Sequence, residues 1–191
     1  MVTEKYKIKL IDDGNKALKN NLWNDGIKIF NELNEIFPKN HLVLVNLSTC
    51  LLRSKHYKEC HLILDKLEKL SPLNVEVNYL RGSCYEYEKD LDRALESYKK
   101  CLRIDKEHFD SWVKCAYILR LKKDFSQSID VYKEILKKTQ RVDILIDLAI
   151  TMHLNDQNDE AISILDQVTT NFPDNELAKD VQKVIKEKMK K

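Results

Sequence analysis

A 34-residue spacing of prolines and glycines is the feature that most constrains this chain. Pro38 and Pro72 are 34 residues apart, and Pro173 follows Pro72 by 101, one fewer than three times 34. Gly14 and Gly82 are 68 residues apart. A fixed period of this length is typical of repeat architectures. Counted from residue 7, each proline is the thirty-second residue of its unit, and the five units are 7–40, 41–74, 75–108, 109–141 and 142–175.

Residues at the same position in successive units form a column, and the residue sizes in several columns agree with helix packing. Two columns, the eighth and the twentieth, hold only small residues, and the twenty-fourth holds only large ones. The eighth residues are Gly14, Ser48, Gly82, Ala116 and Ala149, the twentieth are Gly26, Cys60, Ala94, Ser128 and Ala161, and the twenty-fourth are Phe30, Leu64, Tyr98, Tyr132 and Leu165. Small residues let two antiparallel helices approach closely, and bulky ones fill the space beside the crossing. Each unit is therefore predicted to be a hairpin of a helix A and a helix B.

Composition supports an all-α fold. Only three glycines and three prolines occur in 191 residues, while 43% of the chain is hydrophobic and 34% is charged. Turns must therefore be few and short, and solvated helix faces must alternate with buried ones. After the last unit, Leu177, Val181 and Ile185 form a helical stripe. We expect residues 176–190 to be a helix that caps the array, and residues 1–191 to be a single domain.

The third unit carries a known pattern most plainly, with Gly82, Tyr85, Ala94 and Tyr98, and the fourth adds Trp112. On these residues the chain resembles the tetratricopeptide repeat family, over residues 7 to about 175. The resemblance implies a right-handed superhelical α-solenoid of about five hairpins. Its A helices would line a concave groove that binds peptides. The departures from the family pattern are Asp13, Arg81, Lys106 and a fourth unit that ends without proline.

The same resemblance, carried over column by column, gives a candidate binding row. The predicted partner-binding residues are Ile11, Asn15, Val45, Asn46, Thr49, Tyr79, Ser83, Val113, Tyr117, Ile146 and Ile150, with groove charges at Glu76, Asp110, Lys114 and Asp147. Ile8 and Leu42 make the first end of the groove apolar, whereas acidic residues gather at the other end. A protein or peptide partner with an apolar part and a basic part would match both ends. The alternative is that part of this row contacts neighbouring helices.

The inventory of reactive residues argues against an enzyme. No phosphate-binding loop, metalloprotease motif or nucleophile elbow occurs, and the five cysteines fall in packing columns. His56, Cys60 and His61 are the nearest approach to a metal cluster, but no second ligand pair follows them. We expect no metal and no cofactor. With 33 basic and 31 acidic residues and no run of 18 apolar ones, we expect neither nucleic-acid binding nor membrane insertion, and a cytoplasmic location.

The function predicted from the sequence is therefore a non-enzymatic scaffold that binds a partner peptide or helix in the groove. Two alternatives come from other classes. The first is a structural subunit that assembles with itself or with a larger complex. The second is a chaperone adaptor, because some domains of this family clamp a C-terminal carboxylate. In those domains, two asparagines and three cations at fixed positions of three successive units hold the carboxylate. Counted from the first unit, these positions hold Ile11, Asn15, Asn46, Glu76 and Leu80. Both asparagines are therefore present, but all three cations are missing.

Overall fold

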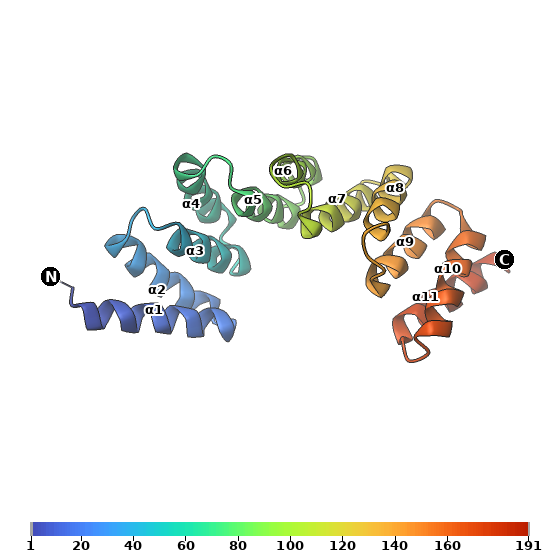
Figure 1. Ribbon diagram of the computed structural model, residues 1–191, viewed down its shortest axis with the longest axis horizontal. Coiled ribbons are helices and arrows are strands. Elements are labelled where there is room, and N and C mark those ends of the chain that lie inside the picture. Colours follow the sequence, from blue (N-terminus) through green and yellow to red (C-terminus); the bar gives the residue numbers. More distant parts are fainter. Residues whose placement is uncertain (1, 191) are drawn as a thin grey trace. The chain divides into compact units, whose positions relative to one another are not determined.

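The structure, a computed structural model, describes residues 2–190, and the regular secondary structure of that range is entirely α-helical. Its helices are α1 (Glu4–Lys19), α2 (Trp23–Ile36), α3 (His41–Arg53), α4 (Tyr57–Leu70), α5 (Val75–Tyr87), α6 (Leu91–Ile104), α7 (Phe109–Leu121), α8 (Phe125–Leu136), α9 (Val142–Leu154), α10 (Asn158–Asn171) and α11 (Glu176–Met189). Each of the five predicted units contains one pair of successive helices (Figure 1). The predicted all-α class is confirmed.

Side-chain caps explain where several A helices begin. Asn40 precedes α3 and Asn74 precedes α5, and each side-chain oxygen accepts a hydrogen bond from the backbone N–H three residues later. Asn175 caps α11 in the same way. Such a cap satisfies one of the N–H groups that a helix leaves unpaired in its first turn. The asparagine that closes one hairpin therefore also starts the next helix.

The turn between helices A and B has one conformation throughout the chain. Its fifteenth-column residue has a positive φ of 56° to 65° in all five hairpins. The next residue donates its backbone N–H to a carbonyl five residues earlier, as from Asp90 to Tyr85 at 2.9 Å. This left-handed closure of a helix usually carries glycine. Here the column reads Asn21, Lys55, Lys89, Lys123 and Asp156.

The small-residue columns lie where helices approach most closely, within a hairpin at Gly82 and between successive hairpins at Gly26. A Cβ atom added to Gly82 would lie 2.7 Å from Cε1 of Tyr98, and one added to Gly26 would lie 2.6 Å from Sγ of Cys50. Ala94, Ala116 and the other alanines of these columns have no exposed surface. Tyr98 and Tyr132 of the twenty-fourth column are also fully buried. The small and large columns therefore form the hairpin cores.

The helices fall into two compact units, the first unit, Met1–Lys106 with α1 to α6, and the second unit, Glu107–Lys191 with α7 to α11. From here on, "unit" means one of these two, and each of the five repeats is called a hairpin. Within each unit, helix B of one hairpin packs against helix A of the next, as in α2 with α3, α4 with α5 and α8 with α9. The helix α11 packs on α9 and α10 and buries Ala178 and Ile185. None of the helices in residues 2–190 is long and apolar enough to cross a membrane.

Candidate functional site

The A helices α1, α3 and α5 carry the predicted binding row of the first unit. Ile11 and Asn15 are exposed on α1, and Asn46 and Thr49 are half-buried on α3. Tyr79 is half-buried on α5, and its ring centroid lies 5.6 Å from that of Tyr98. Part of the predicted row is thus accessible on this unit, and the Tyr79 ring packs against the buried ring of Tyr98.

Three members of the predicted row, Val45, Ser83 and Ile146, are buried in this structure, and a partner contact at these positions stays a prediction. Val45 is 4% exposed and Ile146 is 3% exposed, and each belongs to the hydrophobic core of its unit. The reason is that α3 packs against α2, α4 and α5, while α9 packs against α8, α10 and α11. Ser83 is also buried, and its hydroxyl is hydrogen-bonded to that of Tyr98 at 3.1 Å.

Exposed apolar side chains add to the first unit's row. Ile8 on α1 and Leu42 on α3 both occupy the second column, and both are more than half exposed. Ile11 on α1 adds a third exposed apolar side chain, from the fifth column. We call these three residues, Ile8, Ile11 and Leu42, the apolar face of the first unit. The sequence pattern places Ile8 and Leu42 at the apolar end of the groove without including them among the binding residues.

In the second unit the row centres on Tyr117 of α7. This half-buried ring has Lys114 Nζ 5.7 Å from its centroid and the Arg120 guanidinium carbon 5.5 Å from it. Val113 is half-buried one turn before it, and Ile150 is half-buried on α9. Cations over an aromatic face are attracted by its negative quadrupole and hold the ring in place. The Tyr117 ring is therefore a positioned aromatic surface with two cations over it.

The acidic end expected from the sequence is largely neutralised within the second unit. Asp147 accepts a hydrogen bond of 2.9 Å from Arg120, and Asp143 accepts one of 2.6 Å from Arg141. The hydrogen bonds from Arg141 hold the pKa of the Asp143 carboxyl below its usual value. Asp110 is exposed on α7, and in the first unit Glu76 is exposed on α5. The basic part expected of a partner therefore has fewer acidic residues to meet than the sequence suggested.

Two equivalent buried tyrosines have different surroundings. Tyr98 donates its hydroxyl to Glu86 at 2.8 Å and also contacts the Ser83 hydroxyl. Tyr132 occupies the same column in the fourth hairpin, but its buried hydroxyl has no hydrogen-bond partner. The reason lies in the sequence, because the columns that hold Ser83 and Glu86 hold Tyr117 and Arg120 in the fourth hairpin. Arg120 instead pairs with Asp147 on the following hairpin.

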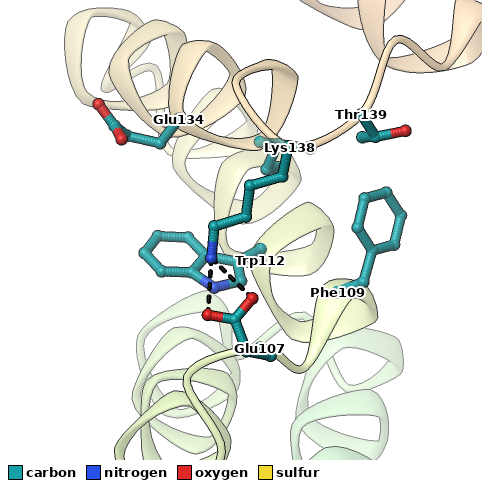
Figure 2. A pocket seen from close by; sticks show the side chains of 7 residues that line it. Glu107, Phe109, Trp112, Glu134, Lys138 and Thr139 are labelled. Atoms are coloured by element: carbon teal, nitrogen blue, oxygen red, sulfur yellow. Dashed lines mark hydrogen bonds and ion pairs between the residues drawn. The ribbon is translucent and has the colours of Figure 1, made fainter.

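A separate cavity of about 260 Å³ lies in the second unit between the start of α7 and the end of α8. Its apolar wall is formed by Phe109, Trp112 and Ile135. Figure 2 shows Lys138 extending across the Trp112 ring to Glu107, and its Nζ lies 2.7 Å from both carboxylate oxygens. None of these residues belonged to the predicted binding row. Their aromatic content was the sequence signal, but Trp112 was interpreted only as a match to the family pattern.

Metal ligands do not gather anywhere in residues 2–190, where no group of three His, Cys, Asp or Glu side chains is placed to hold an ion. His56 pairs with Glu59 at 3.1 Å and His61 with Glu88 at 3.0 Å, while Cys60 is buried in the core. The two histidines of this sequence cluster thus form hydrogen bonds to glutamates, and its cysteine is part of the packing.

The fold defines a helical-hairpin repeat protein, and comparisons with known proteins give its family. The sequence profile of the tetratricopeptide repeat matches residues 75–108 and 143–175, which are the third hairpin and nearly all of the fifth. The chain therefore contains tetratricopeptide repeats, as its sequence pattern predicted. Repeats of this family generally serve as non-enzymatic modules for protein interaction.

Two solved structures and one further relative are similar to this chain. A tetratricopeptide repeat protein from Parabacteroides merdae has a TM-score of 0.81 at 16% identity, covering 94% of this chain and 72% of that one. YrrB, described as a tetratricopeptide repeat protein with an unusual peptide-binding site, has a TM-score of 0.71 at 14% identity, covering 91% and 90%. Mouse DnaJ homolog subfamily C member 7 is 24% identical over 100 residues, which are 52% of this chain and 20% of that protein. The chain thus spans about a fifth of the length of that relative.

Proposed function

We propose that this protein is a non-enzymatic scaffold that binds an apolar segment of a protein partner on its A helices. The observation that carries the proposal is the apolar face of the first unit, where Ile8, Ile11 and Leu42 are exposed on α1 and α3. Exposed apolar side chains that share a surface are typical of interaction sites. The choice is also supported by YrrB, a protein of the same fold that is described as having a peptide-binding site.

The two tyrosines of the row would provide the main anchors. Tyr79 and Tyr117 are each half-buried, so their rings are fixed by the protein and still offer surface to a partner. A tyrosine gives a large contact area with few rotatable bonds to immobilise. Exposed Glu76 and Asp110 would favour a basic residue in the partner and affect the association rate more than the affinity.

A matched pair of leucines tests which surface binds. Leu42 on the A helix α3 is 66% exposed, and Leu62 on the B helix α4 is 63% exposed. Peptides selected from a random twelve-residue display library would be titrated by fluorescence anisotropy against Leu42→Asp and Leu62→Asp. We expect Leu42→Asp to weaken binding at least tenfold and Leu62→Asp to leave the dissociation constant unchanged. Equal losses in both variants, or a loss only in Leu62→Asp, would refute the assignment of the face.

The tyrosine anchors are tested with the same peptides. Tyr79→Ala or Tyr117→Ala should weaken binding by about 2 kcal/mol, which is roughly thirtyfold. Circular dichroism must show that both variants remain folded. If the folded variants bind with unchanged affinity, the anchors lie elsewhere on the A helices.

Self-assembly is a second candidate function, because large apolar side chains are also exposed away from the A helices. Leu62 on α4 and Leu73 in the loop before α5 are both strongly exposed. Light scattering of the purified chain over a range of concentrations separates the two functions. A monomer that binds peptide supports the receptor, while an oligomer dissociated by Leu62→Asp supports assembly through the B-helix side.

A further inference from the structure

The first unit contains two cysteines whose sulfur atoms touch. Cys60 lies on α4 in the second hairpin, and Cys84 lies on α5 in the third. The Sγ–H of Cys84 points to Sγ of Cys60 at 3.2 Å, and both side chains are fully buried. Cys60 also donates a hydrogen bond of 3.3 Å to the backbone carbonyl of Ser48 on α3. These contacts orient one sulfur lone pair toward the other thiol.

The printed contacts of Cys50 and Cys101, the other two cysteines of the first unit, are of a different kind. The Cys101 thiol donates to the carbonyls of Val75 and Ser97, and Cys50 lies beside Gly26. A disulfide needs an S–S distance of about 2.0 Å, so Cys60 and Cys84 must approach by roughly 1 Å. A side-chain rotation and a small shift of α4 relative to α5 can supply that displacement.

We infer that Cys60 and Cys84 are a two-electron oxidation site, at which a hydroperoxide converts the buried dithiol into a disulfide that joins the second and third hairpins. In the first step one sulfur, as its thiolate, attacks an oxygen of the peroxide. The O–O bond breaks, hydroxide leaves and a sulfenic acid forms. The second sulfur then attacks the sulfenic sulfur, the S–O bond breaks and the S–S bond forms. The two sulfurs lose two electrons, the peroxide gains them, and with hydrogen peroxide the two thiol protons leave in two molecules of water.

Burial determines the rate of this oxidation. The hydrogen bond from Cys84, together with desolvation, raises the pKa of the Cys60 thiol, so this side chain is held as a neutral thiol at neutral pH. Because the thiolate is the nucleophile, the closed structure reacts slowly. The interface between α4 and α5 must open transiently before a peroxide molecule reaches either sulfur. The disulfide then holds α5, the helix that carries Tyr79, against α4.

Mass spectrometry of the whole chain tests this inference. The protein is treated with hydrogen peroxide under native conditions, the remaining thiols are alkylated, and the tryptic peptides are compared with and without reduction. We expect a Cys60–Cys84 cross-linked peptide that disappears on reduction. Sub-denaturing urea should accelerate its formation several-fold, because it populates the open interface.

Two sets of variants make the test decisive. Cys60→Ser and Cys84→Ser should each abolish the cross-link. A variant that combines Cys50→Ser, Cys101→Ser and Cys115→Ser keeps only the proposed pair and should form the cross-link at the same rate as the unaltered chain. The inference is overturned if this three-serine variant, folded by circular dichroism, yields sulfinic acid or unmodified thiols and no disulfide. It is also overturned if the unaltered chain forms a different cysteine pair.

Discussion

Replacing Gly82 with alanine tests the packing of the third hairpin most directly. The new Cβ atom would lie 2.7 Å from Cε1 and 2.9 Å from Cδ1 of Tyr98. Carbon atoms in contact prefer a separation of about 3.5–4.0 Å, so the ring must move by roughly 1 Å. Tyr98 is fully buried, and its hydroxyl is fixed by hydrogen bonds to Glu86 and Ser83. The ring therefore cannot move without disturbing both bonds.

Two opposing effects set the magnitude. Overpacking a dense core costs about 1–3 kcal/mol, whereas replacing glycine by alanine inside a helix contributes about 0.5–1 kcal/mol of stability. We expect the clash to dominate, so Gly82→Ala should lower the free energy of unfolding of the first unit by about 1 kcal/mol. Gly82→Leu should lower it further, because its longer side chain cannot be accommodated by the same ring movement.

The two tryptophans allow each unit to be followed separately. Trp23 lies in the first unit and Trp112 in the second, so in a Trp112→Phe background the fluorescence change in urea reports the first unit alone. Tyr98→Leu removes the ring that the alanine would meet. In that background we expect Gly82→Ala to be neutral or stabilising, which gives a coupling of about 1 kcal/mol or more between the two sites. A stabilising Gly82→Ala with Tyr98 intact, or equal effects in both backgrounds, would refute the packing argument.

Substitutions at a core hydroxyl, a turn and the last helix should each have a measurable effect. Tyr98→Phe should destabilise the chain by about 1–2 kcal/mol, whereas Tyr132→Phe should be neutral or stabilising because it removes a hydroxyl that has no partner; urea unfolding of both variants measures the contrast. Lys89→Gly should raise stability by roughly 0.5 kcal/mol, since φ at this position is 65°, and a denaturation midpoint that falls would contradict this. Deleting residues 177–191 should expose the surface that Ala178 and Ile185 cover and cause aggregation; a truncated chain that stays monomeric with an unchanged melting temperature would show that α11 is not a cap.

The helices and their pairing could be predicted from the sequence because close packing imposes a residue size at fixed intervals. Gly82 must be small opposite Tyr98 whatever the partner of the protein is, so the column survives in every hairpin. The turns were less visible. Lys55, Lys89 and Lys123 adopt the left-handed conformation that glycine usually marks, and their column carries no glycine to reveal it. The turn geometry is instead imposed by the helices that it joins.

The candidate site was predicted less completely, because the same column has different neighbours in different hairpins. Ile11 and Val45 share the fifth column, yet Ile11 is exposed on the first helix, while Val45 is buried on a helix with neighbours on several sides. Column position therefore says which way a side chain points, and the number of packed neighbours decides whether a ligand can reach it. A single-hairpin pattern contains only the first of these two facts.

The charges of the A helices follow the same principle across successive hairpins. Glu86 and Arg120 share the twelfth column, but Glu86 accepts from the tyrosine of its own hairpin, and Arg120 reaches Asp147 on the next. The twelfth column is thus acidic in the third hairpin and basic in the fourth. As a result, Tyr132 has no carboxylate to accept its hydroxyl hydrogen, and Asp147 of the second unit is paired with Arg120. A count of acidic and basic residues along the row misses this exchange. In the second unit a partner would meet the ring of Tyr117 with two cations over it. Of the acidic residues that the sequence suggested there, Asp143 and Asp147 are paired with arginines.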